Sequence, residues 1–448
     1  MHNITLEDFS GVDFGDVRRE KRFVSIINHI SSQPGSSIPR QNESWYDVKA
    51  TYEFFKNEEV SLPALQKAVM AYGAKQVSKE MSVLIIHDIS NICFHSLDAK
   101  GLGYVDSNQG RGILCYSSIM ATPDGLPLSL LYQHTWTRPN EQLGKAAKRK
   151  QRQFTEKESY RWYDGVRQTT QLLGPSVHKI HVADRQADIY DLFFTAHQPN
   201  TDLLIRAGHN RRASDGSPVW DLVGKQPPSA TITLDIPDVT GKKKKAISAE
   251  VRYQQVKILR PLRSENQYES VILNAIEIKE VPSADRKQED RIDWKLLTTI
   301  EVQNVTDVLQ CVKWYTYRWL IERFHYVLKS GTKIETLQLK QAESLQKAIT
   351  VYSLAAFRIM QLVYNSRHHP NVNCEVALTP LQWKVLYILI HKKKDIPPEP
   401  PTLLQAVNWI GKLGGHLGRK SDGPPGLKTV WLGYNKLHLA IQVYEIAI

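Results

Sequence analysis

Two short runs, Ser82-Val-Leu-Ile-Ile-His-Asp88 and Lys179-Ile-His-Val-Ala-Asp184, decide how this chain is expected to fold. Each run leads through apolar residues to an aspartate, a pattern typical of a central strand buried on both faces. We predict that both runs are strands of one sheet. Because ligands gather at the carboxyl ends of strands in sheets of this class, Asp88 and Asp184 are expected to meet if the strands are neighbours.

The surrounding sequence predicts a mixed α/β core. The turn signal Pro123-Asp124-Gly125 separates two β-rich runs, 113–122 and 126–134, which predicts a hairpin between the two strands. Residues 162–173 have a helical pattern. The order strand, hairpin, helix, strand indicates a mixed sheet with helices packed on it. His87 and His181 should point to the opposite strand face from the aspartates, and we interpret them as structural.

A chain of 448 residues is too long for one ordinary core, so several units are expected. The predicted division is a helical unit at 1–74 that suits DNA-end binding, the first part of a mixed α/β core at 75–200, a β-rich insertion at 201–300, the second part of that core at 301–370, and a further helical unit at 371–448. In the first unit, Asp16 can cap a helix that carries Arg18 and Arg22. These arginines fit a DNA contact or an ordinary solvated face equally well.

Composition limits the class of protein. A net charge of +12 and a pI near 9.3 favour a polyanionic partner, usually nucleic acid. No apolar run is long enough to span a membrane, and the N-terminus does not resemble a secretory signal. Four scattered cysteines suit a reducing compartment. We therefore expect a cytoplasmic protein.

The stretch from Tyr315 to Lys329 predicts one amphipathic helix. At about 100° per residue, Tyr315, Arg318, Glu322 and Lys329 fall within an arc of roughly 60°, opposite a face of apolar residues. A carboxylate beside cationic residues suits a metal ligand flanked by phosphate contacts. A charged helix face stabilised by opposite charges explains the same pattern. If this helix packs across the two strands, three carboxylates converge, enough to hold two Mg²⁺ ions for phosphoryl transfer.

At these residues the chain resembles the bacterial insertion-sequence transposases of the DDE class, in the group named for the signature Y-x2-R-x3-E-x6-K. The signature is complete here. Asp184-Arg-Gln186-Ala-Asp188 is close to the family's D-R-E-A-D, with Gln186 in place of Glu. Asp88-Ile89-Ser90 stands where the family has D-T-T or D-T-S, so Ile89 is a departure that leaves the carboxylate in place.

The resemblance implies a ribonuclease-H-like core interrupted by the β-rich insertion, and a DNA transposase in the bacterial cytoplasm, associated with the nucleoid. It implies cut-and-paste transposition by strand nicking, hairpin formation, hairpin opening and strand transfer. Asp88, Asp184 and Glu322 would be the catalytic residues and would hold two Mg²⁺ ions, for which Mn²⁺ can substitute. No nucleotide cofactor is implied.

The resemblance also implies particular DNA contacts. Tyr315, Arg318 and Lys329 would contact phosphates near the cut, and Trp294 would stack on a flipped base, with Arg206 beside it. The partners would be double-stranded DNA at the element's ends, target DNA, and a second copy of the chain in a homodimer. Two alternatives stay open: a decayed transposase that only binds DNA, and a metal nuclease of the same core that never joins strands.

Overall fold

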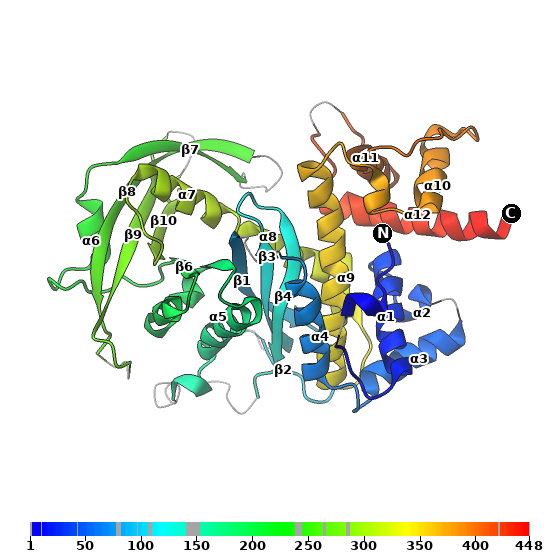
Figure 1. The fold of residues 1–448 in the computed structure, drawn as a ribbon, viewed down its shortest axis with the longest axis horizontal. Coiled ribbons are helices and arrows are strands. Elements are labelled where there is room, and N and C mark those ends of the chain that lie inside the picture. The colour runs from blue at the N-terminus through cyan, green and yellow to red at the C-terminus, as the bar shows by residue number, and fades with distance from the viewer. Residues whose placement is uncertain are drawn as a thin grey trace.

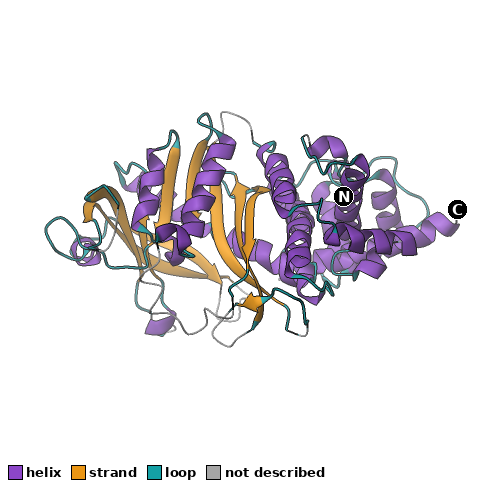
Figure 2. Ribbon diagram, turned by 90° about the horizontal axis from the view of Figure 1, so that it is seen from below, coloured by secondary structure: helices purple, strands orange, loops and turns teal. Residues whose placement is uncertain are grey.

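The computed structural model describes residues 2–9, 11–42, 44–77, 82–95, 97–105, 110–139, 153–237, 244–262, 266–283, 287–419 and 422–447. Its described strands form one mixed sheet of ten strands, and a helical region lies beside that sheet (Figure 1). The strands occupy one half of the molecule and most of the N- and C-terminal helices the other (Figure 2). In the part of the chain that the structure describes, no helix is both long and apolar enough to cross a membrane.

Five strands make the centre of the sheet, in the order β4-β3-β1-β5-β6, with the two-residue β2 (Gly103–Tyr104) paired to the edge of β3. They are β1 (Ser82–Cys93), β3 (Arg111–Ala121), β4 (Pro127–Trp136), β5 (His178–Ala183) and β6 (Thr201–Arg206). β4, β3 and β1 are antiparallel, whereas β1, β5 and β6 are parallel. This antiparallel meander continued by parallel strands confirms the predicted mixed, ribonuclease-H-like core.

The predicted hairpin between β3 and β4 is also confirmed. Gly125 lies in its turn at φ +89°, a conformation that glycine adopts without strain. A side chain there would also collide with the ring of Tyr317. The turn therefore serves both the hairpin and the packing of the segment that carries the signature residues.

The four strands of the predicted β-rich insertion extend this sheet and do not form a separate layer. They are β7 (Ala230–Pro237), β8 (Lys244–Leu259), β9 (Ser270–Glu280) and β10 (Asp293–Thr298), all antiparallel to their neighbours. β10 also pairs with β6, so the sheet runs without a break from the core into the insertion. The division of the chain into five units, including the limit at 200/201, stays a proposal.

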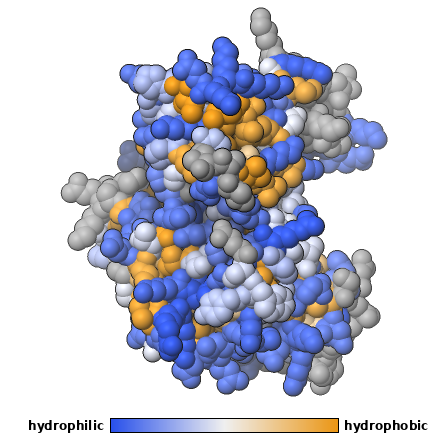
Figure 3. Space-filling model, turned by 90° about the vertical axis from the view of Figure 1, so that its right-hand side faces the viewer, coloured by the Kyte–Doolittle hydropathy of each residue, from blue (hydrophilic) through white to orange (hydrophobic). Residues whose placement is uncertain are grey.

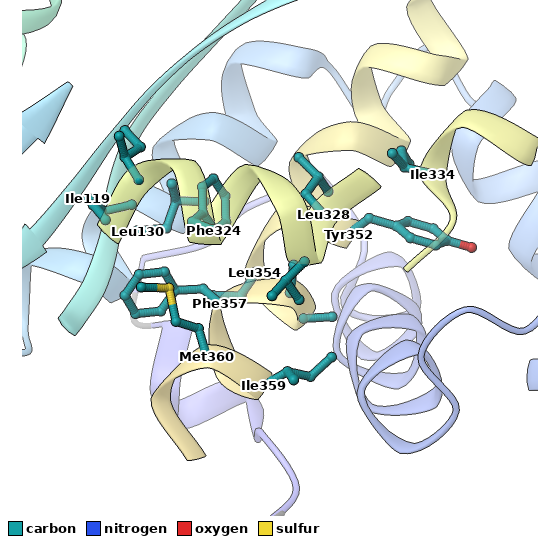
Figure 4. Close-up of a cluster of buried hydrophobic side chains, with 14 of the residues drawn as sticks. Ile119, Leu130, Phe324, Leu328, Ile334, Tyr352, Leu354, Phe357, Ile359 and Met360 are labelled. Atoms are coloured by element: carbon teal, nitrogen blue, oxygen red, sulfur yellow. The ribbon is translucent and has the colours of Figure 1, made fainter. Parts of the chain in front are cut away.

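Helices at both ends of the chain pack around one long central helix, α9 (Ala342–His368), which is buried along most of its length. The N-terminal helices are α1 (Val17–Ser32), α2 (Ile38–Gln41), α3 (Trp45–Lys56) and α4 (Leu62–Ala74), and the C-terminal helices are α10 (Pro380–His391), α11 (Leu403–Leu413) and α12 (Leu427–Ala447). Asp16 caps α1 as predicted, accepting a hydrogen bond from the backbone of Arg18. Figure 4 shows α9 residues such as Phe357 and Met360 beside Phe324.

The two faces of the central sheet have different covers. Leu84, Ile86 and Val182 share a core with α9 and with the segment that contains the signature residues. On the other face Val83 and Ile85 pack with Leu173 of α5 (Tyr160–Leu173). Successive residues of β1 and β5 therefore enter different surroundings, as the strand period of two requires.

Candidate active site

Asp88 lies within β1, two residues beyond the last strand pair with β5. The parallel register between these strands ends at Ile86 opposite Val182, and β1 continues to Cys93. The sequence had suggested that Asp88 ends its strand. The strand instead continues past Asp88, because β1 stays paired with β3 as far as Cys93. Its carboxylate accepts a hydrogen bond from the Ile89 backbone at 2.8 Å, and its side chain is 18% exposed.

Asp184 directly follows β5, as predicted, and accepts a hydrogen bond from the backbone of Gln186 at 2.9 Å. Burial raises the pKa of Asp184, and the nearby charge of Asp88 raises it further, while the Gln186 hydrogen bond and Arg318 lower it. Two carboxylates thus sit close enough to repel one another in a partly buried site. A cation between them would relieve that repulsion.

Glu322 lies on α8 (Trp319–Tyr326), which packs against β1 and β3. Its carboxylate contacts the guanidinium of Arg318 one helical turn earlier. Within the described residues, no three His, Cys, Asp or Glu side chains gather closely enough to hold a metal ion. The structure therefore brings Asp88 near Asp184 but leaves Glu322 engaged by Arg318.

The single helix predicted from Tyr315 to Lys329 is wrong. The segment is α7 (Val305–Thr316), then α8, then a π-helical turn at Val327–Gly331. Tyr317 and Arg318 each donate their backbone N–H to the carbonyl three residues earlier, which tightens the chain between α7 and α8. The break separates Tyr315 from Glu322, and the π-helical turn contains Lys329, so the four signature residues do not lie on one regular helix.

Tyr315 is 3% exposed and Trp294 of β10 packs edge-on against its ring, with 5.3 Å between ring centroids. Arg206 ends β6, and its guanidinium donates to the backbone carbonyl of Asp293 at 3.3 Å. Trp294, Arg206, Tyr315 and Arg318 line one cavity of about 630 Å³, together with residues 232–235 of β7. The cavity is therefore bounded by aromatic rings and by cationic side chains.

Lys329 lines a different cavity, of about 700 Å³, whose wall includes the residues that follow both aspartates. Ile89 and Ser90 come from β1, and Arg185 and Gln186 from the turn after β5. Arg138 lines the same space and is bound to Glu158 at 2.5 Å. Lys329 therefore lines the cavity next to both aspartates, and Tyr315 is close enough to Asp184 to feel its charge. Both residues remain proposed DNA contacts.

The two arginines predicted on α1 have different surroundings. Arg18 has a side chain that is 87% exposed and forms an ion pair with Asp16 at 2.7 Å. Arg22 is mostly covered and bonds to Asp47 of α3 at 2.8 Å, which ties two helices of the N-terminal unit together. Both line a groove between α1 and α3. Arg18 is therefore the more accessible of the two proposed DNA contacts.

Two residues near the site were missed in the sequence. Asp188, whose side chain is fully buried, accepts backbone hydrogen bonds from Gly208 and His209 and pairs with Arg211 at 2.7 Å, so it holds the loop after Arg206. His325 places Nδ1 3.6 Å from Asp88, and its buried Nε2 has no hydrogen-bond partner in the described structure. The spacing Asp184-x3-Asp188 was the only sequence signal for either.

Comparisons with known proteins bear on both ends of the chain. Residues 1–60 match the family model for transposase DNA-binding domains, and residues 354–447 match the model for the Tn5 transposase dimerisation domain. Among solved structures, a cryo-EM structure of a piggyBac transposase synaptic complex with hairpin DNA is similar at a TM-score of 0.40 and 9% identity, over 79% of this chain and 67% of that one. This likeness is too remote to carry an argument, whereas the two family matches flank the candidate site.

Proposed function

From the premise that this chain is a Tn5-family transposase, with a DNA-binding domain and a dimerisation domain, we propose that it performs cut-and-paste transposition at Asp88, Asp184 and Glu322. The observation that carries this proposal is the pair of coupled aspartates, which lie on the sheet face that α8 covers. Glu322 is on that same helix.

The donor set fits divalent magnesium or manganese. Asp88 and Asp184 supply hard carboxylate oxygens, and the partly exposed position of Asp88 leaves room for water and a phosphate. Two such ions, when bound, would activate the attacking oxygen and stabilise the leaving one in phosphoryl transfer. Asp88, Asp184 and Glu322 would hold them.

Arg318 has two competing partners in this proposal. In the structure it engages Glu322, while its charge also acts on Asp184. A guanidinium binds phosphate in the same forked geometry as carboxylate. A DNA phosphate that draws Arg318 away would free the Glu322 carboxylate to join the aspartates. Completion of the site by its third carboxylate would then depend on DNA, whereas Asp88 and Asp184 would bind a metal ion without it.

The DNA chemistry would be nicking, hairpin formation, hairpin opening and strand transfer, all at one site. Hairpin formation bends a strand sharply, and extruding a base relieves the crowding. The cavity between Trp294 and Arg206 would receive that base, with Trp294 stacking on it. Burial raises the pKa of Tyr315, so its hydroxyl stays protonated and can donate to a phosphate.

The homodimer contact would involve α12. Leu432, Leu439 and Val443 are 40%, 56% and 67% exposed, and their spacings of seven and four residues place them on one helix face. Figure 3 shows hydrophobic residues on the upper part of the helical end, where Figure 1 places α10 to α12. A second copy of the chain would cover this row.

The direct test incubates a linear fragment carrying the element's two ends with the full chain and Mg²⁺, and compares wild type with Glu322→Gln. Wild type should give hairpin-ended products and joined strands, and Glu322→Gln should bind the ends without cutting. Cutting without joining would identify a nuclease. Binding without cutting by wild type, in Mn²⁺ as well, would identify a decayed DNA-binding relative.

A further inference from the structure

Beneath the two aspartates, on the other face of the sheet, four side chains form a buried hydrogen-bonded chain. The Tyr116 hydroxyl is 2.8 Å from His87 Nδ1, His87 Nε2 is 2.9 Å from His181 Nδ1, and His181 Nε2 is 3.0 Å from Thr170 Oγ1. Both histidines are 0% exposed. The chain links β3, β1, β5 and α5, and Ser118 adds a second contact to His87 at 2.8 Å.

A charged imidazole is disfavoured where it is removed from water, and both rings are fully buried. A neutral imidazole has one donor and one acceptor nitrogen. With both nitrogens of each ring engaged, every hydrogen bond fixes the tautomer of the next ring, and the two rings are held at one separation.

These hydrogen-bonded side chains lie where they can affect the spacing of the two aspartates. Main-chain pairing between β1 and β5 stops at Ile86 and Val182, one residue short of His87 and two short of each aspartate. The imidazole bond runs diagonally across the end of the ladder, from His181, which pairs with Ile85 inside it, to His87, the first residue of β1 beyond it. A chain of apolar side chains could fill the same volume but would fix no distance between the strands.

We propose that His87 and His181 are positioning residues that set the separation of Asp88 and Asp184, and hence the affinity of the carboxylate pair for divalent metal. This inference rests on the proposed function, because it requires that the aspartates bind metal. Outer groups that orient ligands typically change metal affinity by about 10–100-fold when removed. The histidines touch neither DNA nor metal and act only through the strands.

The experiment titrates the full-length chain with Mn²⁺ and follows free ion by electron paramagnetic resonance, which needs no DNA and no turnover. His181→Phe keeps the ring and removes both hydrogen bonds, and should weaken Mn²⁺ binding at least about tenfold. His181→Asn keeps a polar group near the Nδ1 position and should restore part of that affinity.

Two adjacent threonines supply a matched pair of milder variants. Thr170→Val removes the hydroxyl that meets His181, whereas Thr169→Val removes one that bonds only to carbonyls within α5. Both residues are buried on the same helix. Thr170→Val should weaken Mn²⁺ binding and Thr169→Val should leave it unchanged, and this pair decides the matter even if His181→Phe does not fold.

The outcomes separate the two proposals. If wild type binds Mn²⁺, Asp184→Asn abolishes binding, and folded His181→Phe and Thr170→Val keep wild-type affinity, the positioning role is overturned and the metal site stands. If wild type and Asp184→Asn show the same absence of binding, the metal site itself fails and the positioning role fails with it. Weakened binding in Thr170→Val but not in Thr169→Val supports the inference.

Discussion

The two faces of β1 and β5 both carry polar residues near the end of the ladder between these strands, yet these residues differ in exposure and in their partners. On one face Asp88 and Asp184 lie near each other, partly exposed, within reach of the charge of Arg318. On the other face His87 and His181 are sealed under α5 with every nitrogen engaged. We call these the acidic face and the histidine face. Because side chains alternate along a strand, the aspartates, whose repulsion a bound cation would relieve, lie on one face. The histidines, whose hydrogen bonds are already made within the protein, lie on the other.

The largest expected difference between the faces is in activity. Asp184→Asn should reduce cleavage of element ends by about a thousandfold or more, because losing a metal ligand forfeits several kcal/mol of charge stabilisation. His181→Phe, on the histidine face, should retain measurable cleavage at high Mn²⁺. Gel assays of cleavage, with end binding measured in parallel, check both. Normal cutting by Asp184→Asn would remove the acidic face from the chemistry.

A second, smaller effect on activity is expected at the cavity that Trp294 lines. Stacking on one extruded base is worth about 1–3 kcal/mol, so Trp294→Ala should slow hairpin formation by about 10–100-fold. First-strand nicking should be nearly unaffected, because it precedes base extrusion. Time courses that resolve nicked from hairpin products test this. Equal slowing of the two steps would reject a stacking role.

For the free energy of unfolding we expect the opposite order, with the larger loss from a change on the histidine face. His181→Phe leaves His87 Nε2 and Thr170 Oγ1 without their buried partner, which should lower the free energy of unfolding by about 1–3 kcal/mol. Thr169→Val should cost less, since its hydroxyl bonds only within α5. Urea unfolding at neutral pH measures both. A histidine-face variant as stable as wild type would show that the network contributes nothing to folding.

The smallest effect is a pH-dependent loss of stability that the acidic face causes. Because burial and Asp88 raise the folded-state pKa of Asp184, the folded chain holds that proton more tightly than the unfolded chain. Stability therefore falls as pH rises from the unfolded pKa through the folded one, and the loss persists at neutral pH.

Asp184→Asn removes this loss, so its Tm in metal-free buffer should exceed that of wild type at pH 7. Below about pH 3, where the wild-type carboxyl is largely protonated in both states, the two proteins should melt alike. Differential scanning calorimetry across that range checks the sign. A lower Tm for Asp184→Asn at pH 7 would show that the aspartate pair is not under strain.

Much of this arrangement could be predicted from local sequence. The apolar runs before Asp88 and Asp184, and the turn at Gly125, gave the right strands because period and turn chemistry are local properties. Strand alternation also placed the histidines opposite the aspartates. Their engagement with Tyr116 and Thr170 could not be foreseen, because both partners come from other elements.

The signature segment was harder to predict. An ideal helix put Tyr315 and Lys329 on one stripe, but the tight turn at Tyr317 and the π-helical turn at Lys329 divide them between two cavities. Tyr317, at the break, lies close to Gly125 of the β-hairpin, a contact distant in sequence that the local pattern does not contain. The contact of Arg318 with Glu322 is at helical spacing and could be predicted. Spacing alone does not say whether Glu322 binds Arg318 or a metal ion, because that depends on residues from other elements.

The most direct test of the acidic face is a structure of the chain on paired element ends, with Mn²⁺ located by its anomalous scattering. We predict manganese peaks between the carboxylates of Asp88 and Asp184, with Glu322 turned toward them and Arg318 on a DNA phosphate. Paired ends bound with no manganese at the aspartates, and Glu322 still held by Arg318, would contradict the proposed site.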